Sequence, residues 1–338
     1  MVMIEIDGSY MEGGGQIIRT AIALSAITGK SCRIENIRHN RPNPGLQPQH
    51  LAAVKSVARL CGTEVAANVG DTSLVFKPNK IKGGRYDIDI GTAGAISLVL
   101  QSLILPSIHA EHPTTLEIKG GTHVKWSPSM DYMQQIFCYY MKKLGLDITF
   151  SIEQHGFYPR GGGVIKAKIS PGNPKPLELV TRGNLVGYDA TSIASGDLQK
   201  AQVAERQLKR IEKAFQLSKR NIAYFQAASP GSAVHVSAVY ENCVLGASSI
   251  GERGKSAEKV GEEAANELKS DIDSGACFDR HMSDQILPFL AFAKNDSRIK
   301  VAEITGHVRT NIWVIEKFLP VKFEIDDVEK IITVHTQN

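Results

Sequence analysis

Short strand-like runs alternate with longer apolar runs of helical length along most of the chain. In the first example, residues 3–6 alternate as a strand, three glycines follow at 13–15, and an apolar helix is expected over 16–27. The order of strand, glycine turn and helix recurs three times. The later helices are expected over residues 96–105, 131–144 and 281–293. This repetition predicts an α+β (α/β) fold, and its irregular spacing argues against a solenoid.

The chain of 338 residues is too long for one ordinary core. Its clearest boundary is residues 170–176, a run that holds three prolines and a glycine. Between residues 183 and 276 the pattern of charged and apolar residues changes. The elements expected there are a charged helix at 198–215, a strand at 233–240 and a glutamate-rich helix at 256–270. We therefore expect a large domain of residues 1–182 and 277–338, with a smaller α/β domain, 183–276, inserted into it.

Composition points to a water-soluble globular protein, with 42% hydrophobic and 22% charged residues. No run approaches the roughly 18 apolar residues that a membrane span requires. The first residues lack a basic region followed by an apolar one, so a secretory signal is not expected. We therefore expect a cytoplasmic protein that does not enter a membrane.

The five cysteines are widely spaced and include no C-x-x-C pair. Neither a zinc ribbon nor a disulfide framework is indicated, and reduced thiols are expected. The net charge of +4 is mildly basic, and both signs are interspersed. This charge permits a nucleic-acid partner without requiring one.

The three glycines before the first helix let backbone N–H groups approach an anion at the start of that helix. Glu12 would repel a phosphate there unless a divalent cation lay between them, and Mg²⁺ typically binds one or two carboxylates together with phosphate oxygens. Arg19 lies inside the apolar helix and needs an anionic partner. The alternative is a tight glycine turn, with Arg19 paired to an ordinary carboxylate.

Residues 38–50 form a proline-stiffened segment that begins with two arginines three positions apart. Arg38 and Arg41 suit bidentate recognition of an oxyanion, and His50 lies at the start of a helix. The segment is thus a candidate phosphate clamp, and a solvated charged loop is the alternative.

Isolated polar residues interrupt two other apolar helices. Gln101 lies in residues 98–105, which contain hardly another polar group, and a buried amide must be hydrogen-bonded. Asp284 and Gln285 open a helix of the last repeat. Each could contact a nucleotide or a metal, or could simply satisfy backbone groups and cap a helix.

His307 is predicted to lie on a short turn between Gly306 and small polar residues, where an imidazole is accessible to a ligand. A surface histidine without a role is the alternative. The chain contains no G-x-x-x-x-G-K-[ST] loop, no G-x-G-x-x-G fingerprint and no Lys-x-Asp-Gly segment. If the protein activates a phosphate with ATP, histidine is therefore the available nucleophile.

Four segments together resemble the RNA 3′-terminal phosphate cyclases, in the expected order and over residues 7–321. The segments are residues 12–19, residues 38–50, residues 155–163, and residues 307–311 with 318–320. The resemblance implies a large domain of three repeated β/α units, each similar to the C-terminal domain of translation initiation factor three, and a smaller inserted domain.

The resemblance also implies a reaction in three steps. A histidine attacks the α-phosphate of ATP and forms a histidine–AMP adduct, AMP passes to the 3′-phosphate of an RNA end, and the neighbouring 2′-hydroxyl closes a 2′,3′-cyclic phosphate and releases AMP. The implied ligands are ATP, RNA with a 3′-phosphate end and a divalent cation, Mg²⁺ or Mn²⁺. The resemblance leaves the oligomeric state open, with a homodimer as one alternative.

Carried over by position, the resemblance assigns a role to thirteen residues. His307 is the nucleophile, through Nε2, and Glu12 binds the metal. The positions matching ATP contacts are Gln101, His281, Met282, Ser283, Asp284 and Gln285. The positions matching contacts to the triphosphate or the RNA terminal phosphate are Arg19, Arg38, Arg41, Gln49 and His50.

Three other functions compete with this one. A ribosome-assembly relative of the same fold would lack the nucleophile, whereas this chain carries His307 together with Glu12, Arg41 and Asp284. An enolpyruvyl-type transferase would share the repeats and the arginines without needing the His-x-x-Thr-Asn segment. A simple RNA-binding module would show aromatic platforms in a basic stripe, and aromatics here are only 7% and scattered.

Overall fold

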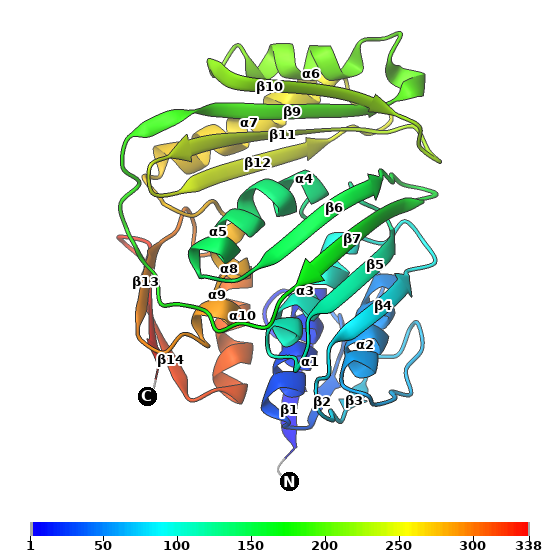
Figure 1. Cartoon of the computed structure of the whole chain (residues 1–338), viewed down its shortest axis with the longest axis vertical. Helices are drawn as coiled ribbons and strands as arrows, with labels where there is room; N and C mark the ends of the chain where they lie inside the picture. Colours follow the sequence, from blue (N-terminus) through cyan, green and yellow to red (C-terminus); the bar gives the residue numbers. More distant parts are fainter. Residues whose placement is uncertain (1–2, 337–338) are drawn as a thin grey trace.

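The computed structural model describes residues 3–336, which form four small sheets with helices packed on them (Figure 1). The first sheet has the order β1-β2-β3, with β1 parallel to β2 and β3 antiparallel to it. Its elements are β1 (Ile4–Asp7), α1 (Gly15–Thr28), β2 (Cys32–Glu35), α2 (Pro48–Leu60) and β3 (Leu74–Phe76). Because α1 and α2 each follow a parallel strand, their amino ends lie near one edge of this sheet.

Two further sheets share one topology although they come from distant parts of the chain. Their orders are β4-β5-β7-β6 and β8-β13-β15-β14, and in each the first pair is parallel and the next two are antiparallel. The strands are β4 (Gly84–Asp89), β5 (Thr114–Gly120), β6 (Ile148–Gln154), β7 (Gly163–Ile169), β8 (Glu178–Leu179), β13 (Ser297–Lys300), β14 (Val321–Asp326) and β15 (Ile331–Thr336). The mixed α+β class expected from the sequence is confirmed.

The helices of these two units depart from the prediction in places. The helices are α3 (Ile96–Ile108), α4 (Met130–Tyr132), the π-turn η1 (Met133–Phe137), α5 (Cys138–Lys143), α8 (Met282–Gln285), α9 (Leu287–Leu290) and α10 (Gly306–Phe318). The single helix predicted over 281–293 is wrong, because α8 ends at Gln285 and α9 begins two residues later. Pro288 lies in the first turn of α9, where a missing N–H does no harm, but inside one long helix it would break the ladder.

The fourth sheet, β10-β9-β11-β12, lies between β8 and β13 in sequence and at one end of the molecule (Figure 1). It contains β9 (Leu185–Ser195), η2 (Gly196–Leu198), α6 (Val203–Ile211), β10 (Leu217–Phe225), β11 (Ser232–Tyr240), β12 (Val244–Ile250) and α7 (Ala257–Asp273). The helix predicted over 198–215 is shorter than expected, because Gln202 at its N-cap has a left-handed backbone, with φ of 50°. Asp279 ties this sheet to the rest, since it accepts from Tyr132 Oη at 2.7 Å and from Gly246 N at 3.1 Å.

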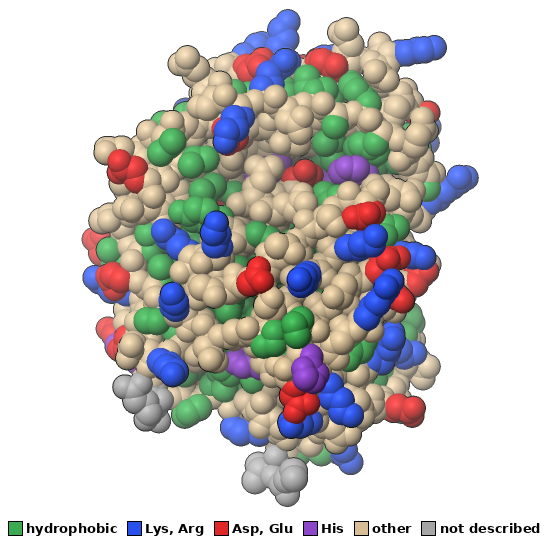
Figure 2. All heavy atoms as spheres, viewed as in Figure 1, with side chains coloured by type: hydrophobic (Ala, Val, Ile, Leu, Met, Phe, Trp, Pro, Cys, Tyr) green, Lys and Arg blue, Asp and Glu red, His purple; other side chains and the backbone are tan. Residues whose placement is uncertain are grey.

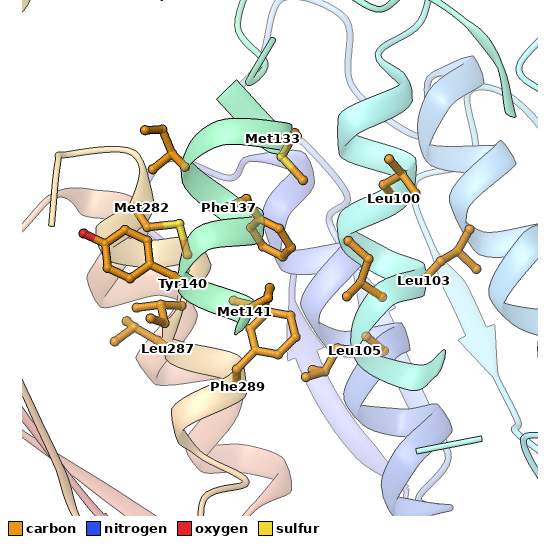
Figure 3. Packing of buried hydrophobic residues seen from close by; sticks show 14 of the residues in the cluster. Leu100, Leu103, Leu105, Met133, Phe137, Tyr140, Met141, Met282, Leu287 and Phe289 are labelled. Carbon is orange, nitrogen blue, oxygen red and sulfur yellow. The ribbon is translucent and has the colours of Figure 1, made fainter. Parts of the chain in front are cut away.

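A core of apolar side chains fills the space between α3, the helix that contains η1, and α9. Figure 3 shows Phe137 and Phe289 pointing into this space, with Leu105 of α3 opposite them. The two rings pack edge to face, with centroids 5.8 Å apart. Across residues 3–336, no helix is long and apolar enough to cross a membrane.

Candidate active site

His307 lies in the first turn of α10. Thr305 is the N-cap residue, and its hydroxyl accepts a hydrogen bond from Val308 N at 3.2 Å. The short turn predicted around His307 is therefore wrong, because the cap extends the helix back to Gly306. The imidazole is still accessible, with 47% of its side chain exposed.

Glu12 and Arg41 meet His307 at the amino end of α1. Glu12 Oε2 lies 3.4 Å from His307 Nε2 and 3.2 Å from Arg41 Nη2. Gly306 makes room for the carboxylate, since a Cβ at that position would lie 2.6 Å from Glu12 Oε1. Gly14 lies between the other two groups, because its Cβ would be 3.5 Å from Arg41 Nη2 and 3.7 Å from His307 Cε1. A basic, an acidic and a nucleophilic group therefore share one half-exposed position.

Gln16 orients the imidazole of His307. Its Oε1 accepts a hydrogen bond from His307 Nδ1, while its Nε2 donates to Asp284 Oδ2 at 2.7 Å and to His307 O at 3.1 Å. Because both amide hydrogens of Gln16 are used elsewhere, Oε1 must act as the acceptor and Nδ1 as the donor. In the neutral imidazole this arrangement leaves the lone pair on Nε2.

A pocket lies next to His307, between α1, α3, α9 and α10. Polar groups line one part of it and apolar side chains the other. The lining residues are Gln16, Arg19, Thr20, Ala23, Gln101, Leu105, Phe137, Asp284, Gln285, Pro288, Phe289 and Asn311. Such a mixture suits a ligand with a flat apolar part and a charged part.

Arg19 is the strongest sign of an anionic ligand in this pocket. It is half-buried, and within residues 3–336 it has neither a hydrogen-bond nor an ion-pair partner. Burial lowers the pKa of Arg19 to about 10, although the charge of Asp284 opposes that shift. A guanidinium so placed is stabilised by a ligand that brings negative charge.

Asn311 and Thr20 support the polar side of the pocket, and the sequence did not single them out as site residues. Asn311 Nδ2 donates to Asp284 O at 2.8 Å, and Thr20 Oγ1 donates to Asn311 Oδ1 at 2.8 Å. Burial raises the pKa of Asp284, although His307 and Arg19 oppose the shift. The available signal was spacing, since His307 and Asn311 are four residues apart and share one face of α10.

Residues 281–285 divide between two environments. Asp284 and Gln285 face the pocket, and Gln101 Nε2 donates to Gln285 Oε1 at 2.8 Å. Met282 is buried beside Tyr140 in the core (Figure 3). Ser283 is also buried, and its hydroxyl donates to the backbone carbonyl of Asp279, which precedes α8, at 2.7 Å.

His281 points away from the pocket, with its Nε2 3.0 Å from Glu267 Oε1. Burial opposes its charge, but the hydrogen bond and the negative charge of Glu267 raise the pKa of His281 to about 9. Only the last two residues of the predicted ATP segment therefore present their side chains to the pocket.

The two arginines of segment 38–50 make different contacts. Arg38, with φ of 54°, donates to Asn43 O and to Gly45 O, the latter at 3.2 Å. Burial and the neighbouring Arg41 lower the pKa of Arg38. Arg38 therefore holds its own loop in shape, whereas Arg41 reaches Glu12.

Gln49 and His50 hold helix ends together. Gln49 Oε1 accepts from Ala95 N at 3.0 Å, at the start of α3. His50 is buried, and its Nδ1 accepts from Gln47 N at 3.1 Å. The opposite edge of the ring, which carries Nε2, fills the space beside Gly15. A Cβ at Gly15 would lie 2.2 Å from His50 Nε2. Burial and the charges of Arg19 and Arg38 lower the pKa of His50 to about 3, so it is neutral.

The residues present give a divalent cation one protein ligand near His307. Among residues 3–336, no three His, Cys, Asp or Glu side chains gather closely enough to hold a metal ion. Glu12 is half-exposed and lies beside His307. Since Mg²⁺ commonly combines one carboxylate with substrate phosphates and water, these residues fit a cation that arrives with its ligand.

The family model and the relatives found by sequence agree with each other. A family model described as RNA 3′-terminal phosphate cyclase matches residues 10–325. A protein of that name from Methanopyrus kandleri is 44% identical over 337 residues, covering 96% of both chains, and one from Pyrococcus furiosus is 42% identical over 330 residues, covering 96% of this chain and 95% of the relative. A solved structure, the enolpyruvyl transferase NikO from Streptomyces tendae, is 10% identical over 99% of this chain and 82% of its own, with a TM-score of only 0.28.

Proposed function

The chain belongs to the RNA 3′-terminal phosphate cyclase family and is an enzyme of that type, and on this premise we propose that it uses ATP to convert an RNA 3′-phosphate end into a 2′,3′-cyclic phosphate, releasing AMP and pyrophosphate. The observation that carries this proposal is an accessible histidine, oriented by Gln16, next to a pocket in which Arg19 has no anionic partner among residues 3–336. The reaction is expected in the cytoplasm.

The first step forms a covalent adduct on His307. The lone pair of Nε2 attacks the α-phosphorus of ATP, a P–N bond forms, the P–O bond to the β-phosphate breaks, and pyrophosphate leaves. Nδ1 keeps its proton, and Gln16 Oε1 stabilises the positive charge that develops on the ring. Arg19 and Arg41 would stabilise negative charge on the phosphates, which is a large contribution in phosphoryl-type transfer.

The second and third steps return the enzyme to its starting state. An oxygen of the RNA 3′-phosphate attacks the phosphorus of the adduct, the P–N bond breaks, and RNA carries AMP through a new P–O–P linkage. The adjacent ribose 2′-hydroxyl then attacks the RNA phosphorus, loses its proton, and expels AMP. Because the hydroxyl is on the same ribose as the phosphate, proximity favours ring closure.

The remaining groups of the pocket would bind the nucleotide and the cation. Adenine fits the apolar wall made by Leu105, Phe137 and Phe289, with Gln101 and Gln285 as hydrogen-bonding groups at its edge. A divalent cation, Mg²⁺ or Mn²⁺, would be held by Glu12 and neutralise the triphosphate when bound. Arg38, Gln49 and His50 would act through the loop and helix ends that they hold.

The proposal extends to the architecture. The sheets β4-β5-β7-β6 and β8-β13-β15-β14 and the shorter β1-β2-β3 would be the three repeated units that resemble the C-terminal domain of translation initiation factor three. Their common pattern of parallel and antiparallel neighbours supports this reading. Residues 1–182 and 277–338 would form the large domain, and 183–276 the inserted one.

The test is incubation with Mg²⁺ and ATP labelled at the α-phosphate, followed by a denaturing gel. Label on the protein that is labile in acid and stable in alkali is expected, because a P–N bond to histidine has those properties. RNA with a 3′-phosphate should remove the label, and the same RNA with a 3′-hydroxyl should not. A folded protein that takes up no label would instead support a non-catalytic ribosome-assembly role or an enolpyruvyl-type transfer.

A further inference from the structure

Two surface loops lie side by side next to the inserted sheet. Residues 122–126 follow β5, and residues 155–162 join β6 to β7. Thr122 N donates to Gly156 O at 2.9 Å, and His123 and Phe157 form an isolated parallel bridge. Each loop then presents one aromatic side chain to solvent. Trp126 is 89% exposed and Tyr158 is 77% exposed.

This exposure is unusual for large aromatic side chains, which gain free energy when buried. No other aromatic residue within 3–336 is comparably exposed. Trp126 also has a left-handed backbone, with φ of 61°, which is an uncommon conformation for a bulky residue. Strained and exposed residues of this kind are concentrated at ligand sites.

Basic side chains accompany the two rings. Lys125 Nζ lies 5.1 Å from the centroid of the Trp126 ring and 2.9 Å from Glu252 Oε2. Arg160 is exposed, and the part of the chain that the structure describes offers it no acidic partner. Flat rings beside arginine and lysine are the combination that binds single-stranded nucleic acid, through base stacking and phosphate contacts.

A series of close backbone approaches connects these loops with His307. A Cβ on Gly161 would lie 2.9 Å from Ala93 Cα, and one on Gly94 would lie 3.1 Å from Gln49 Cβ. Gln49 is followed by His50, which packs on Gly15 at the start of α1, next to the nucleophile. These contacts link the two loops to the amino ends of α1, α2 and α3, near which His307 lies.

The inserted sheet supports the loop that carries Tyr158. Arg160 N donates to Ser229 Oγ at 3.2 Å, and Gly231 is so close to Phe157 that a Cβ there would lie 2.2 Å from the ring. Figure 1 shows the β6–β7 connection reaching toward this sheet. The inserted part thus holds the loop in place.

We propose that Trp126 and Tyr158 form a stacking subsite for the nucleotides that precede the 3′-phosphate of the RNA substrate, with Lys125 and Arg160 contacting the backbone phosphates. This subsite rests on the proposed function, because it assumes that the 3′ end lies at His307. Figure 2 shows acidic and basic side chains intermixed on the face viewed, without a broad basic area. In this subsite, stacking, which accepts any base, would supply much of the affinity for the strand.

The first experiment compares RNA length. The double variant Trp126→Ala, Tyr158→Ala should bind and cyclise a 3′-phosphorylated decamer with a KM raised roughly tenfold or more. A nucleoside 3′-phosphate, which has no preceding nucleotides, should react with unchanged kinetics. Val328→Ala, which removes an almost equally exposed side chain from the β14–β15 turn, is the matched control and should change neither substrate.

The second experiment measures stacking directly. The chain has only two tryptophans, so Trp313→Phe leaves Trp126 as the only tryptophan reporter. A single-stranded RNA with a 3′-phosphate should quench its fluorescence, and a nucleoside 3′-phosphate should not.

The outcomes separate the two hypotheses. Equal effects of the double variant on long and short substrates, or no quenching by RNA, would overturn the subsite even if cyclisation proceeds. Quenching without any labelling by ATP would keep the subsite and refute the proposed reaction. Labelling of the double variant by ATP, a step that involves no RNA, should match wild type and confirms that the fold is intact.

Discussion

Two of the histidine–carboxylate pairs in this protein differ sharply in their access to solvent. His307 and Glu12 are 3.4 Å apart, and each is nearly half-exposed. His123 and Asp131 are 2.5 Å apart, with His123 fully buried and Asp131 13% exposed. In the half-exposed pair, either group can leave the other and bind a phosphate or a cation instead. In the buried pair, separation would leave a charged or polar group without a partner and with little access to water, so the two groups must stay together.

The buried pair belongs to a larger cluster where the inserted sheet meets the rest. His155 stacks on Phe225 of β10 with ring centroids 3.9 Å apart, and His235 Nδ1 lies 2.9 Å from Ser248 Oγ. His155 Nδ1 and His235 Nε2 are buried without a hydrogen-bond partner in the described chain. Burial would raise the pKa of Asp131, but the hydrogen bond and charge of His123 hold it below its usual range. This cluster therefore contributes to packing, whereas the exposed pair is accessible to a ligand.

The largest expected difference between the pairs is in activity. His307→Asn should reduce labelling by ATP and cyclisation by at least about a thousandfold, since the nucleophile itself is removed. Circular dichroism and the unfolding midpoint should stay at wild-type values because the side chain is half-exposed. Arg309→Ala is the matched control on the same helix turn, where Arg309 pairs only with the exposed Asp327. Cyclisation that survives in His307→Asn would exclude this histidine as the nucleophile.

The buried pair should show the reverse result. Asp131→Ala leaves His123 buried without its acceptor, so the free energy of unfolding should fall by about 3 kcal/mol. The folded fraction should still be labelled by ATP, because no residue of the pocket has changed. Urea unfolding measures the first quantity and the labelling assay the second. A loss below about 1 kcal/mol would show that the buried pair contributes no more to the free energy of unfolding than a surface ion pair does.

The carboxylate of the exposed pair should affect the cation more than the fold. Glu12→Ala should lower the labelling rate about 10- to 100-fold and raise the Mg²⁺ concentration needed for half-maximal rate. Glu12→Gln, which keeps the shape and loses the charge, should show the same metal dependence. If the Mg²⁺ titration of both variants matches wild type, Glu12 does not act through a metal.

Mild acid should weaken the protein through the buried cluster. Burial lowers the pKa values of His155 and His235 to about 4, against an ordinary value of 6.5. Between these values the unfolded chain binds more protons, so stability is full above pH 6.5 and is lost as the pH falls toward 4. From pH 7 to 5.5 we expect a loss of about 1 kcal/mol for each histidine. His235→Gln should flatten the profile in urea titrations, and an unchanged slope would contradict this assignment.

One histidine should act in the opposite direction. His281 has a pKa raised to about 9 by Glu267, so its stabilising effect is complete below pH 6.5 and is lost as the pH rises through 9. In Glu267→Gln, the alkaline part of the stability profile should therefore become shallower than in wild type.

The sequence predicted the fold class, because glycine turns and apolar periodicity leave local signatures, and its resemblance to the cyclases implied that Glu12, Arg41 and His307 share one site. It could not predict which way side chains point on irregular segments. Met282 lies one position from His281 and three from Gln285, yet it packs in the core, because the chain breaks into two short helices there. Likewise, the sequence suggested the same phosphate-binding role for Arg38 and Arg41. In the structure, the backbone of Arg38 is left-handed, and its guanidinium donates to its own loop.

The pair His123–Asp131 gave no signal in the sequence. Its members are eight residues apart across an irregular loop, and no helical or strand period relates them. The same limit applies to Trp126 and Tyr158, which are 32 positions apart in the numbering and lie on two loops joined by the bridge between His123 and Phe157. Nothing in the sequence indicated that these two loops are neighbours.

The hydrogen bond between Gln16 and His307 joins residues 291 positions apart. During translation, α1 therefore leaves the ribosome long before His307, the proposed nucleophile, is added to the chain. A growing chain that has not yet reached α10 carries the glycine turn, Arg19 and Glu12 without the proposed nucleophile. If His307 is the nucleophile, translation products that end before residue 306 would be silent in adenylation, and only a chain that includes α10 could carry out the proposed reaction.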